Sequence, residues 1–515
     1  MRTNQSFILT LFFCLCSISS LSAGSHEAGY QFLDDIRESA AMIPLKFNSA
    51  LEDSSKNHAD YLAANRRSSH QQNRGYRHFT GKTPADRAVY TGYLSRSVLE
   101  NLSSGQKNIQ RSVEGLMGAI YHRFGFLDFT IDEIGIGVSR NRNTKYFVFN
   151  MGNERLNQFC RHAPSVSRGA YVAHACQHVE KVSAKKFRKI NQDTEQKNPP
   201  LVLWPPPMSE EIPTTFYEET PDPLPDRSVS GYPISIQFNP YYFKKVKLKR
   251  FKLFNADYGN EIRPTRLLNS RRDVNRKFTD LQFALFPLKP LQWGTYYRVE
   301  ITAIANGKTF EKQWFFRTQD AAKSLFLIKG KDESLQVQAR KQYSIHLPPQ
   351  GYLPIIENLK WQSTGKLKVS VDWQDKNTIL VKLQGDQCER ADFSLNGNRR
   401  FSVQIAERDN LREDHFYPMQ ARTPCLLPIQ KKLSGFRVKA RGEQLKMRSG
   451  QDYWVEINLR NELIGQLNAR YPRNVQIKVQ QITPNLFRIR LTGPAREKVD
   501  FQLPQRRRFS VTLTK

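Results

Sequence analysis

The chain has 515 residues, and its 79 lysine and arginine residues against 48 aspartate and glutamate residues give a formal net charge of +31. This length exceeds what one hydrophobic core usually serves, so about three to five domains are expected. Beyond the N-terminal segment no run approaches the roughly 20 apolar residues of a membrane-spanning helix, which argues against a transmembrane protein. The charge favours association with polyanions, and a solvated surface adapted for solubility is the alternative.

Residues 1–23 have the pattern of a signal peptide. One early charge, Arg2, precedes an apolar run from Phe7 to Cys16, and small residues follow at 22–24. The apolar run is too short to act as a stop-transfer helix. The sequence therefore predicts a secreted or periplasmic protein whose mature chain begins near Gly24.

A helical pattern extends from 30 to 65, with a short extended piece at 45–47. Within the second helix, His58 recurs at helical spacing with the apolar positions, so we predict that its side chain faces the core.

The next elements complete an α/β domain. A loop followed by a helix is predicted over 101–120, and alternating apolar residues on either side of a polar turn predict a β-hairpin over 134–150. Helices followed by an antiparallel hairpin indicate an α/β fold with an antiparallel sheet.

Four cysteines follow the predicted signal peptide: Cys160, Cys176, Cys388 and Cys425. An even number in an exported chain indicates disulfides, and sequence proximity favours Cys160 with Cys176 and Cys388 with Cys425, with free thiols as the alternative. The first pair would close a loop of about 15 residues, which is worth roughly 3 kcal/mol in the chain-entropy model. No CxxC spacing occurs, which argues against zinc held by cysteines.

Proline marks the end of the first region. The segment 198–226 contains repeated prolines and predicts an extended, semi-rigid spacer. After it, the aromatic-rich or alternating segments 234–238, 296–301 and 314–317 predict strands of β-sandwich domains.

The last third of the chain contains an internal repeat. Four segments of the first copy recur at a constant offset of 108 residues, as from Val403 to Val511, which indicates a tandem duplication of a small β-domain. The segments 366–371, 380–383, 392–395 and 399–403 correspond to 474–479, 488–491, 500–503 and 507–511.

An ordered set of motifs in the first region resembles the CAP superfamily of cysteine-rich secretory and pathogenesis-related proteins, particularly its bacterial branch. The resemblance covers about 27–153 and implies an α-β-α sandwich in a secreted protein. Its motifs are Lys56-Asn-His58-Ala59, His70, His78-Phe-Thr-Gly-Lys-Thr-Pro84, Gly92-Tyr93, Leu99-Glu-Asn-Leu102 and Tyr121-His122.

The resemblance also implies a cleft that collects two histidines and two glutamates. His70, His122 and Glu100 match three of these positions, and two imidazoles with a carboxylate suit zinc or a similar ion. The second glutamate would fall near Ala119 and is missing, and Glu114 lies off that helix face. The alternative is that both histidines are ordinary hydrogen-bonded residues and that Glu100 only holds its loop.

Catalytic motifs are otherwise absent from the sequence. It contains no GxSxG elbow, no HExxH pair and no phosphate-binding glycine loop, so an enzyme is not the default expectation. The first alternative is a metal-assisted hydrolase or peptidase that activates water between His70 and His122. A further alternative is an adhesion scaffold in which the CAP domain is only a stable head.

The module over 228–319 resembles the immunoglobulin-like domain that follows the CAP domain in some bacterial secreted proteins. Within it, 244–254 alternates basic and apolar side chains, so one strand face would carry a row of cations. Such a row could bind phosphates or sulfated glycans, or it could be an edge strand that lysines protect from aggregation. Arg271, Arg272, Arg276, Lys277 and 506–508 extend the basic surface. No RNA-binding aromatic signature accompanies it, which argues against sequence-specific nucleic-acid recognition.

The leading hypothesis is a secreted, non-enzymatic binding protein. Its cleft would hold a small ligand or divalent cation, and its basic β-modules would associate with anionic glycans, lipopolysaccharide or phospholipid. The predicted domains are the signal peptide (1–23), the CAP domain (24–153), a disulfide-linked extension with a proline-rich linker (154–229), an immunoglobulin-like sandwich (230–320) and two β-domain repeats (321–430 and 431–515).

Overall fold

A computed structural model describes most of the chain, as two compact units that divide between Asp320 and Ala321. No helix in the described part of the chain is long and apolar enough to cross a membrane. The described residues are 20–142, 144–217, 219–321, 325–328, 333–348, 359–364, 366–395, 400–406, 433–439, 441–457, 467–483, 486–503 and 508–515.

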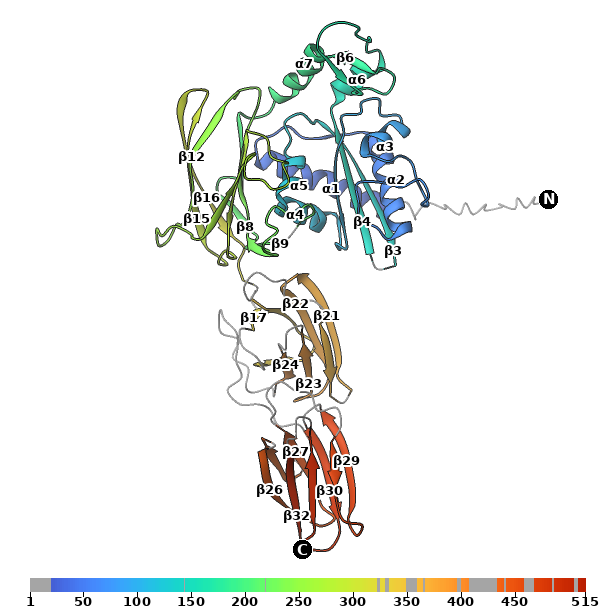
Figure 1. The fold of residues 1–515 in the computed structure, drawn as a ribbon, viewed down its shortest axis with the longest axis vertical. Coiled ribbons are helices and arrows are strands. Elements are labelled where there is room, and N and C mark those ends of the chain that lie inside the picture. The colour runs from blue at the N-terminus through green and yellow to red at the C-terminus, as the bar shows by residue number, and fades with distance from the viewer. Residues whose placement is uncertain are drawn as a thin grey trace, which may run out of the picture. The chain divides into compact units, whose positions relative to one another are not determined.

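The N-terminal part of the first unit is a four-stranded sheet packed with helices (Figure 1). The order of its strands is β1-β3-β4-β2, in which β1 pairs with β3 in parallel and the other pairs are antiparallel. Its elements are α1 (Ser20–Ser39), β1 (Lys46–Phe47), α2 (Ser49–Asn65), α3 (Pro84–Tyr90), β2 (Leu99–Ser104), α4 (Ile109–Gly118), α5 (Ile120–Phe126), β3 (Glu133–Asn141) and β4 (Thr144–Gly152). The two N-terminal helices, the extended piece between them and the hairpin are as predicted.

Helix α2 lies directly against strand β3. Its N-terminus is capped by the Asn48 side chain, and the Ser55 hydroxyl donates to the Gly135 carbonyl at 2.8 Å. A Cβ atom built at Gly135 would lie 2.0 Å from the backbone of α2, and one at Gly137 would lie 2.1 Å from it. Only glycine allows this approach, so the two glycines set the position of α2 and of the residues that follow it.

Two sequence predictions for this region were wrong in detail. The start of 101–120, expected as a loop, belongs to β2 (Leu99–Ser104), so Glu100 lies on a strand that pairs with β4. The helix expected to continue to His122 breaks at Ala119, whose backbone is extended, and this break separates α4 from α5. Ala119 offers no side-chain cap to α5, so the N-terminus of α5 needs a hydrogen-bond acceptor from elsewhere.

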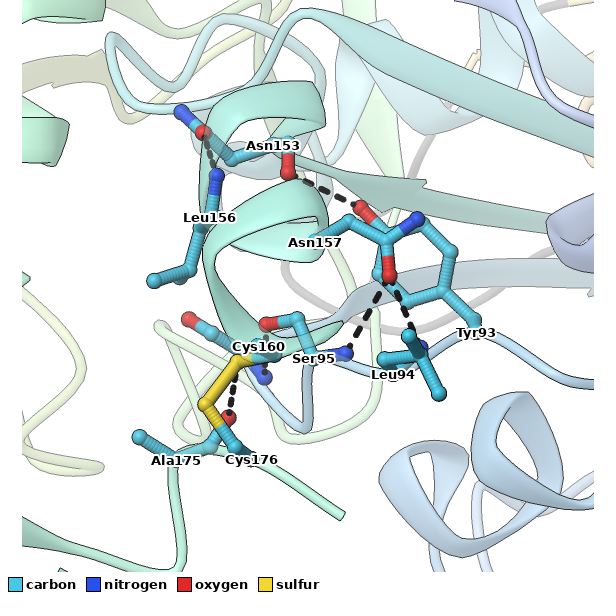
Figure 2. Close-up of a disulfide and its surroundings, with 10 residues drawn as sticks. Tyr93, Leu94, Ser95, Asn153, Leu156, Asn157, Cys160, Ala175 and Cys176 are labelled. Carbon is cyan, nitrogen blue, oxygen red and sulfur yellow. Dashed lines mark hydrogen bonds between the residues drawn. A yellow bond between two sulfur atoms is a disulfide. The ribbon is translucent and has the colours of Figure 1, made fainter. Parts of the chain in front are cut away.

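A small disulfide-linked extension follows β4. It contains α6 (Glu154–Arg161), β5 (Tyr171–Ala173), β6 (Lys181–Ser183) and α7 (Ala184–Glu195). Figure 2 shows the disulfide between Cys160 and Cys176 beside the segment that follows Tyr93. The Asn157 side chain of α6 accepts hydrogen bonds from the backbone of this segment, at 2.8 Å from Leu94 N.

The rest of the first unit is a β-sandwich of two four-stranded sheets. The strand orders are β13-β14-β11-β7 and β12-β15-β16-β8, and β9 pairs with β10 beside them. The strands are β7 (Leu201–Trp204), β8 (Ser209–Ile212), β9 (Thr215–Tyr217), β10 (Val229–Gly231), β11 (Ile234–Phe238), β12 (Val246–Asn255), β13 (Thr265–Leu268), β14 (Gln282–Pro287), β15 (Tyr296–Ala305) and β16 (Lys308–Thr318).

The proline-rich segment is therefore not the spacer that its composition predicted. Its strands β7 and β8 are members of the two sheets, where β7 pairs with β11 and β8 pairs with β16. The prolines lie between and beside these short strands, where the missing backbone donors cost no ladder hydrogen bond.

One continuous hydrophobic core joins the α/β part to this sandwich. It includes Phe149 and Met117 from the first and Ile236 and Phe316 from the second. Arg123 of α5 is fully buried at the junction, where its guanidinium donates hydrogen bonds to Pro233 O at 2.8 Å and Ser235 Oγ at 3.0 Å. The two parts are thus packed as one body.

The second unit consists of two sandwiches with matching topology. In the first, the sheet orders are β17-β19-β22-β21 and β18-β24-β23-β20; in the second, they are β25-β27-β30-β29 and β26-β32-β31-β28. The strands of the first are β17 (Leu325–Leu327), β18 (Glu333–Val337), β19 (Gln342–His346), β20 (Lys360–Ser363), β21 (Lys368–Asp375), β22 (Thr378–Gln384), β23 (Arg390–Ser394) and β24 (Arg400–Ile405). Those of the second are β25 (Gly435–Val438), β26 (Arg441–Arg448), β27 (Asp452–Ile457), β28 (Asn468–Arg470), β29 (Gln476–Thr483), β30 (Leu486–Thr492), β31 (Lys498–Gln502) and β32 (Arg508–Thr514).

Equivalent strands and side chains keep the predicted offset. Strand β21 begins at 368 and β29 at 476, a difference of 108. The stacked pair Phe393–Phe401 recurs as Phe501–Phe509, each with ring centroids 4.8 Å apart. Each sandwich buries its own core.

Candidate functional site

Glu100 and His70 form the first half of the candidate site. The His70 Nδ1 atom lies 2.9 Å from Glu100 Oε1, and the Arg87 Nη2 atom lies 2.6 Å from Glu100 Oε2. Burial of the Glu100 carboxyl opposes its ionisation, but the Arg87 and His70 contacts outweigh that effect and lower the pKa of Glu100 below its usual range. Glu100 is therefore a carboxylate near neutral pH, and it can only accept hydrogen bonds.

Local structure places Arg87 and His70 around this carboxylate. Helix α3 begins with a capping box between Thr83 and Asp86, with Pro84 in its first turn, and this start orients Arg87 one residue later. Arg87 also donates to the His70 carbonyl at 3.1 Å. One buried arginine thus holds both the glutamate and the segment that carries the histidine.

His58 is a structural residue beside this pair. It is fully buried in α2; its Nε2 atom lies 3.0 Å from the Ser69 carbonyl and its Nδ1 atom 3.0 Å from Gln72 Nε2. Burial lowers the pKa of His58 to about 4, so the ring is neutral, with one nitrogen donating and the other accepting. This agrees with the core position that the helical spacing predicted.

His122 has a carboxylate partner that sequence reasoning missed. Its Nδ1 atom lies 2.9 Å from Oε2 of Glu219, a residue of the proline-rich segment 97 positions further along the chain. The Oε1 atom of Glu219 also accepts from Ile120 N at 2.6 Å. Glu219 therefore caps the start of α5, which Ala119 leaves uncapped, and contacts His122 with the same carboxyl group.

The rings of His70 and His122 face each other, and each has a glutamate partner at Nδ1. Their rings stack with centroids 6.4 Å apart and planes 25° apart, and each Nδ1 atom lies 2.9 Å from a buried glutamate. Because a carboxylate accepts, each ring donates from Nδ1, and in the neutral form of the ring the lone pair is then on Nε2. The His70 side chain is 41% exposed and that of His122 is 13% exposed, so a ligand can reach this pair from solvent.

The donor set fits a metal only in part. Metal-bound histidines commonly donate their other ring nitrogen to a carboxylate, which is the arrangement of both rings here. However, no three His, Cys, Asp or Glu side chains in the described ranges are grouped as they would be around a metal ion. Glu100 and Glu219 approach the imidazoles at Nδ1, so they act as outer partners rather than as ligands. Two Nε2 atoms are the donors that remain for a cation.

The predicted site residues have mixed outcomes. His70, Glu100 and His122 lie together, while Glu114 is a half-exposed residue that pairs with Arg111. Asn101 donates to the His122 carbonyl at 2.8 Å, so its side chain satisfies a backbone group of α5. The signal that could have indicated Glu219 is the acidic pair 218–219 within the proline-rich segment.

Of the two predicted cysteine pairs, one lies wholly within the described residues and the other only in part. Cys160 and Cys176 form the disulfide favoured by their proximity in the sequence. Cys388 is also disulfide-bonded, while Cys425 lies outside the described residues, so their pairing stays a prediction. The signal peptide likewise falls almost entirely outside the described residues.

Most of the basic segment 244–254 lies in β12, at the edge of its sheet. A register shift between Leu248 and Arg250 exposes Lys249 and Arg250 together, and Lys247 is exposed on the same strand. Arg250 forms an ion pair with Glu300 at 2.7 Å. The position at the edge agrees with protection against aggregation, and it leaves binding to polyanions open.

A second basic segment is anchored next to His122. Arg271, Arg272, Arg276 and Lys277 are all exposed. The Tyr121 hydroxyl donates to Asp273 within this loop, and Asn275 donates to the Tyr121 oxygen at 3.0 Å. Burial and the Asp273 hydrogen bond raise the pKa of Tyr121 far above its usual range. Of 506–508, only Arg508 lies within the described residues, and it is exposed.

Comparison with known proteins gives one family match. Residues 30–151 match the model of the cysteine-rich secretory protein family, known as CAP. No curated protein matches the chain.

Solved structures match parts of the chain. An outer surface protein of Borrelia burgdorferi is 22% identical, with 26% of this chain and 94% of that chain covered and a TM-score of 0.23. An extracellular protein of Bacillus anthracis that contains an SCP domain is 17% identical, with 26% and 41% covered and a TM-score of 0.23. The glucan-utilisation protein SGBP-B of Bacteroides ovatus is 9% identical, with 62% and 71% covered and a TM-score of 0.13. This chain therefore spans less than half of the B. anthracis protein.

Proposed function

The chain carries a CAP domain at residues 30–151, and we propose that this domain binds a small ligand or a divalent cation through the Nε2 atoms of His70 and His122. The observation that carries the proposal is the facing pair of imidazoles, each backed by a buried glutamate. In the described part of the chain neither Nε2 atom is seen in a hydrogen bond to protein. The protein is then an exported binding protein rather than an enzyme.

Zinc is the cation that this donor set would suit best. The two Nε2 atoms would hold it, and water or ligand atoms would supply the remaining positions of a four-coordinate ion. Bound there, zinc would act as a Lewis acid towards the ligand. With two protein donors instead of the three or four of most zinc sites, binding is expected to be weak and readily reversed.

Calorimetric titration of the full chain with zinc tests the cation form of the proposal. Wild type should release or absorb heat, and both His70→Ala and His122→Ala should abolish it. His178→Ala removes an exposed histidine elsewhere and is the matched control, which should leave binding unchanged. Absence of heat with the wild type, or equal binding by all four proteins, would overturn zinc binding at this site.

A hydrolase is the second candidate, and the carboxylate–imidazole pairs favour it. A histidine held by a carboxylate is the usual arrangement of a general base. No serine, threonine or cysteine in the described residues hydrogen-bonds to either Nε2 atom, so a hydrolase would need water as its nucleophile. Lack of turnover of peptides and cell-wall material by the purified chain, with and without zinc, would exclude this candidate.

We further propose that the basic strand β12 associates with anionic glycans or lipid surfaces. The exposed Lys247 and Lys249 support it, as does the net charge of +31. Lys247→Glu with Lys249→Glu should lower the salt concentration at which the chain elutes from an immobilised sulfated polysaccharide. Lys185→Glu with Lys186→Glu, an equal charge reversal on α7, is the control. Identical shifts for both pairs would mean that only net charge matters.

A further inference from the structure

The neighbouring sandwich module supplies a residue to the candidate site. Glu219 belongs to the segment between β9 and β10, which pair with each other. Its side chain is 3% exposed, and it contacts His122 Nδ1 and the first backbone amides of α5. No carboxylate of the α/β part has such a contact with His122 in the described residues.

We propose that Glu219 is the positioning residue of His122, so that the β-sandwich completes the histidine pair. The inference rests on the proposed function for the use of the Nε2 atom. The role of Glu219 is to hold the proton of the neutral ring on Nδ1 and so keep the lone pair on Nε2. Glu219 thus takes the place of the glutamate that the CAP resemblance located near Ala119.

The contacts of Glu219 make this role specific to a carboxylate. Oε1 accepts from Ile120 N, and Oε2 accepts from Tyr121 N at 3.3 Å and from His122 Nδ1. An amide has one accepting and one donating end. In Glu219→Gln the oxygen would be taken by Ile120 N at 2.6 Å, and the NH₂ group would face His122 Nδ1. The ring would then have to accept at Nδ1 and carry its proton on Nε2.

The position of the sandwich supports the same conclusion. The buried Arg123 of α5 hydrogen-bonds to Pro233 and Ser235 of the sandwich, one residue after His122. Tyr121, one residue before it, contacts Asp273 and Asn275 of the sandwich. Tyr121, His122 and Arg123, three consecutive residues of α5, are therefore all held by hydrogen bonds to the sandwich module. The candidate site depends on that module for its geometry.

The test is the tautomer of His122 in the full, metal-free chain. Nitrogen chemical shifts of histidine-labelled protein report which ring nitrogen carries the proton, at a pH about two units above the ordinary histidine pKa of about 6.5. The His122 signals are assigned by their loss in His122→Asn. Wild type should show the proton on Nδ1, and Glu219→Gln should move it to Nε2.

A control and a second measurement keep the proposal falsifiable. Glu210→Gln changes an exposed carboxyl of β8 that contacts Tyr296, and it should leave the tautomer unchanged. A folded Glu219→Gln chain that keeps the proton on Nδ1 would overturn the proposal. A wild-type ring with its proton on Nε2 would also overturn it, even if the variant failed to fold.

Zinc titration separates this inference from the proposed function. Loss of an outer partner typically lowers metal affinity 10- to 100-fold, so Glu219→Gln should weaken zinc binding by about that factor. A tautomer change in a wild type that binds no zinc would support the positioning role while the proposed function failed. Zinc binding by the wild type with no tautomer change in Glu219→Gln would support the proposed function and overturn the positioning role.

Discussion

The chain uses β-sandwiches in two different ways. The sandwich of residues 201–318 shares one hydrophobic core with the α/β part and encloses a buried arginine at the junction. The two sandwiches after residue 320 each bury a separate core. Similar sheets therefore form a dependent module in one case and self-contained modules in the other. The difference arises from the apolar side chains that form the shared core and from polar side chains such as Arg123 and Glu219, which form hydrogen bonds across the boundary.

Among the substitutions that test this difference, Arg123→Ala should lower stability the most. The substitution leaves the Pro233 carbonyl and the Ser235 hydroxyl without the buried donor that Arg123 supplies, and it leaves the Met117 carbonyl with only the Tyr232 hydroxyl. The free energy of unfolding of the first unit should fall by on the order of 5 kcal/mol, because each unsatisfied buried group costs about 1 to 3 kcal/mol. Calorimetry should show the transition of the first unit lowered and the others unchanged.

Hydrogen exchange supplies the control for that experiment. Faster exchange in Arg123→Ala should appear in both the α/β part and the first sandwich. Arg111→Ala removes an exposed arginine of α4 and should change little. Faster exchange confined to α5 would contradict a shared unfolding unit.

Phe501→Ala should have a smaller and strictly local effect. Phe501 is fully buried and stacks on Phe509 in the core of the last sandwich. Removal of a core phenylalanine typically costs about 3 to 5 kcal/mol. Phe393→Ala at the equivalent position should destabilise the preceding sandwich by a similar amount. Each variant should change one calorimetric transition, and a shift of both transitions by either variant would show that the two sandwiches unfold together.

Acid should distinguish the first unit from the last sandwich. The folded pKa of His58 is about 4, below the ordinary value of about 6.5, so between these pH values the unfolded chain binds more protons. The first unit should therefore lose up to about 3 kcal/mol of stability as pH falls from 6.5 to 4. Residues 431–515 contain no histidine, so their transition should lack this dependence. Denaturant unfolding across this pH range, with His58→Gln as a variant in which the loss is reduced, measures the effect.

Local patterns were enough to predict much of the fold. Helical spacing identified His58 as a core residue, alternation identified the β3–β4 hairpin, and the offset of 108 residues anticipated equal strand orders in the last two sandwiches. These features depend on neighbours within one element or on comparison of the chain with itself. The ordered CAP motifs likewise indicated His70, Glu100 and His122.

The missed features depend on contacts between distant segments. Proline content in 198–226 indicated a spacer, because composition does not reveal that β7 and β8 find partners among later strands. The break at Ala119 leaves backbone amides free, and the carboxylate that satisfies them lies 99 residues away in the chain. Local sequence patterns therefore predict neither the pairing of β7 and β8 nor the contact of Glu219 with α5.

The close approach of α2 to β3 has a consequence for protein engineering. Any side chain at Gly135 or Gly137 would overlap the backbone of α2, which cannot yield in the way that the end of a flexible side chain does. A mutational scan should therefore find these two positions intolerant of every other amino acid. Libraries that search for ligands of this domain should keep both glycines and vary the exposed positions of the loop 66–83 around His70 instead.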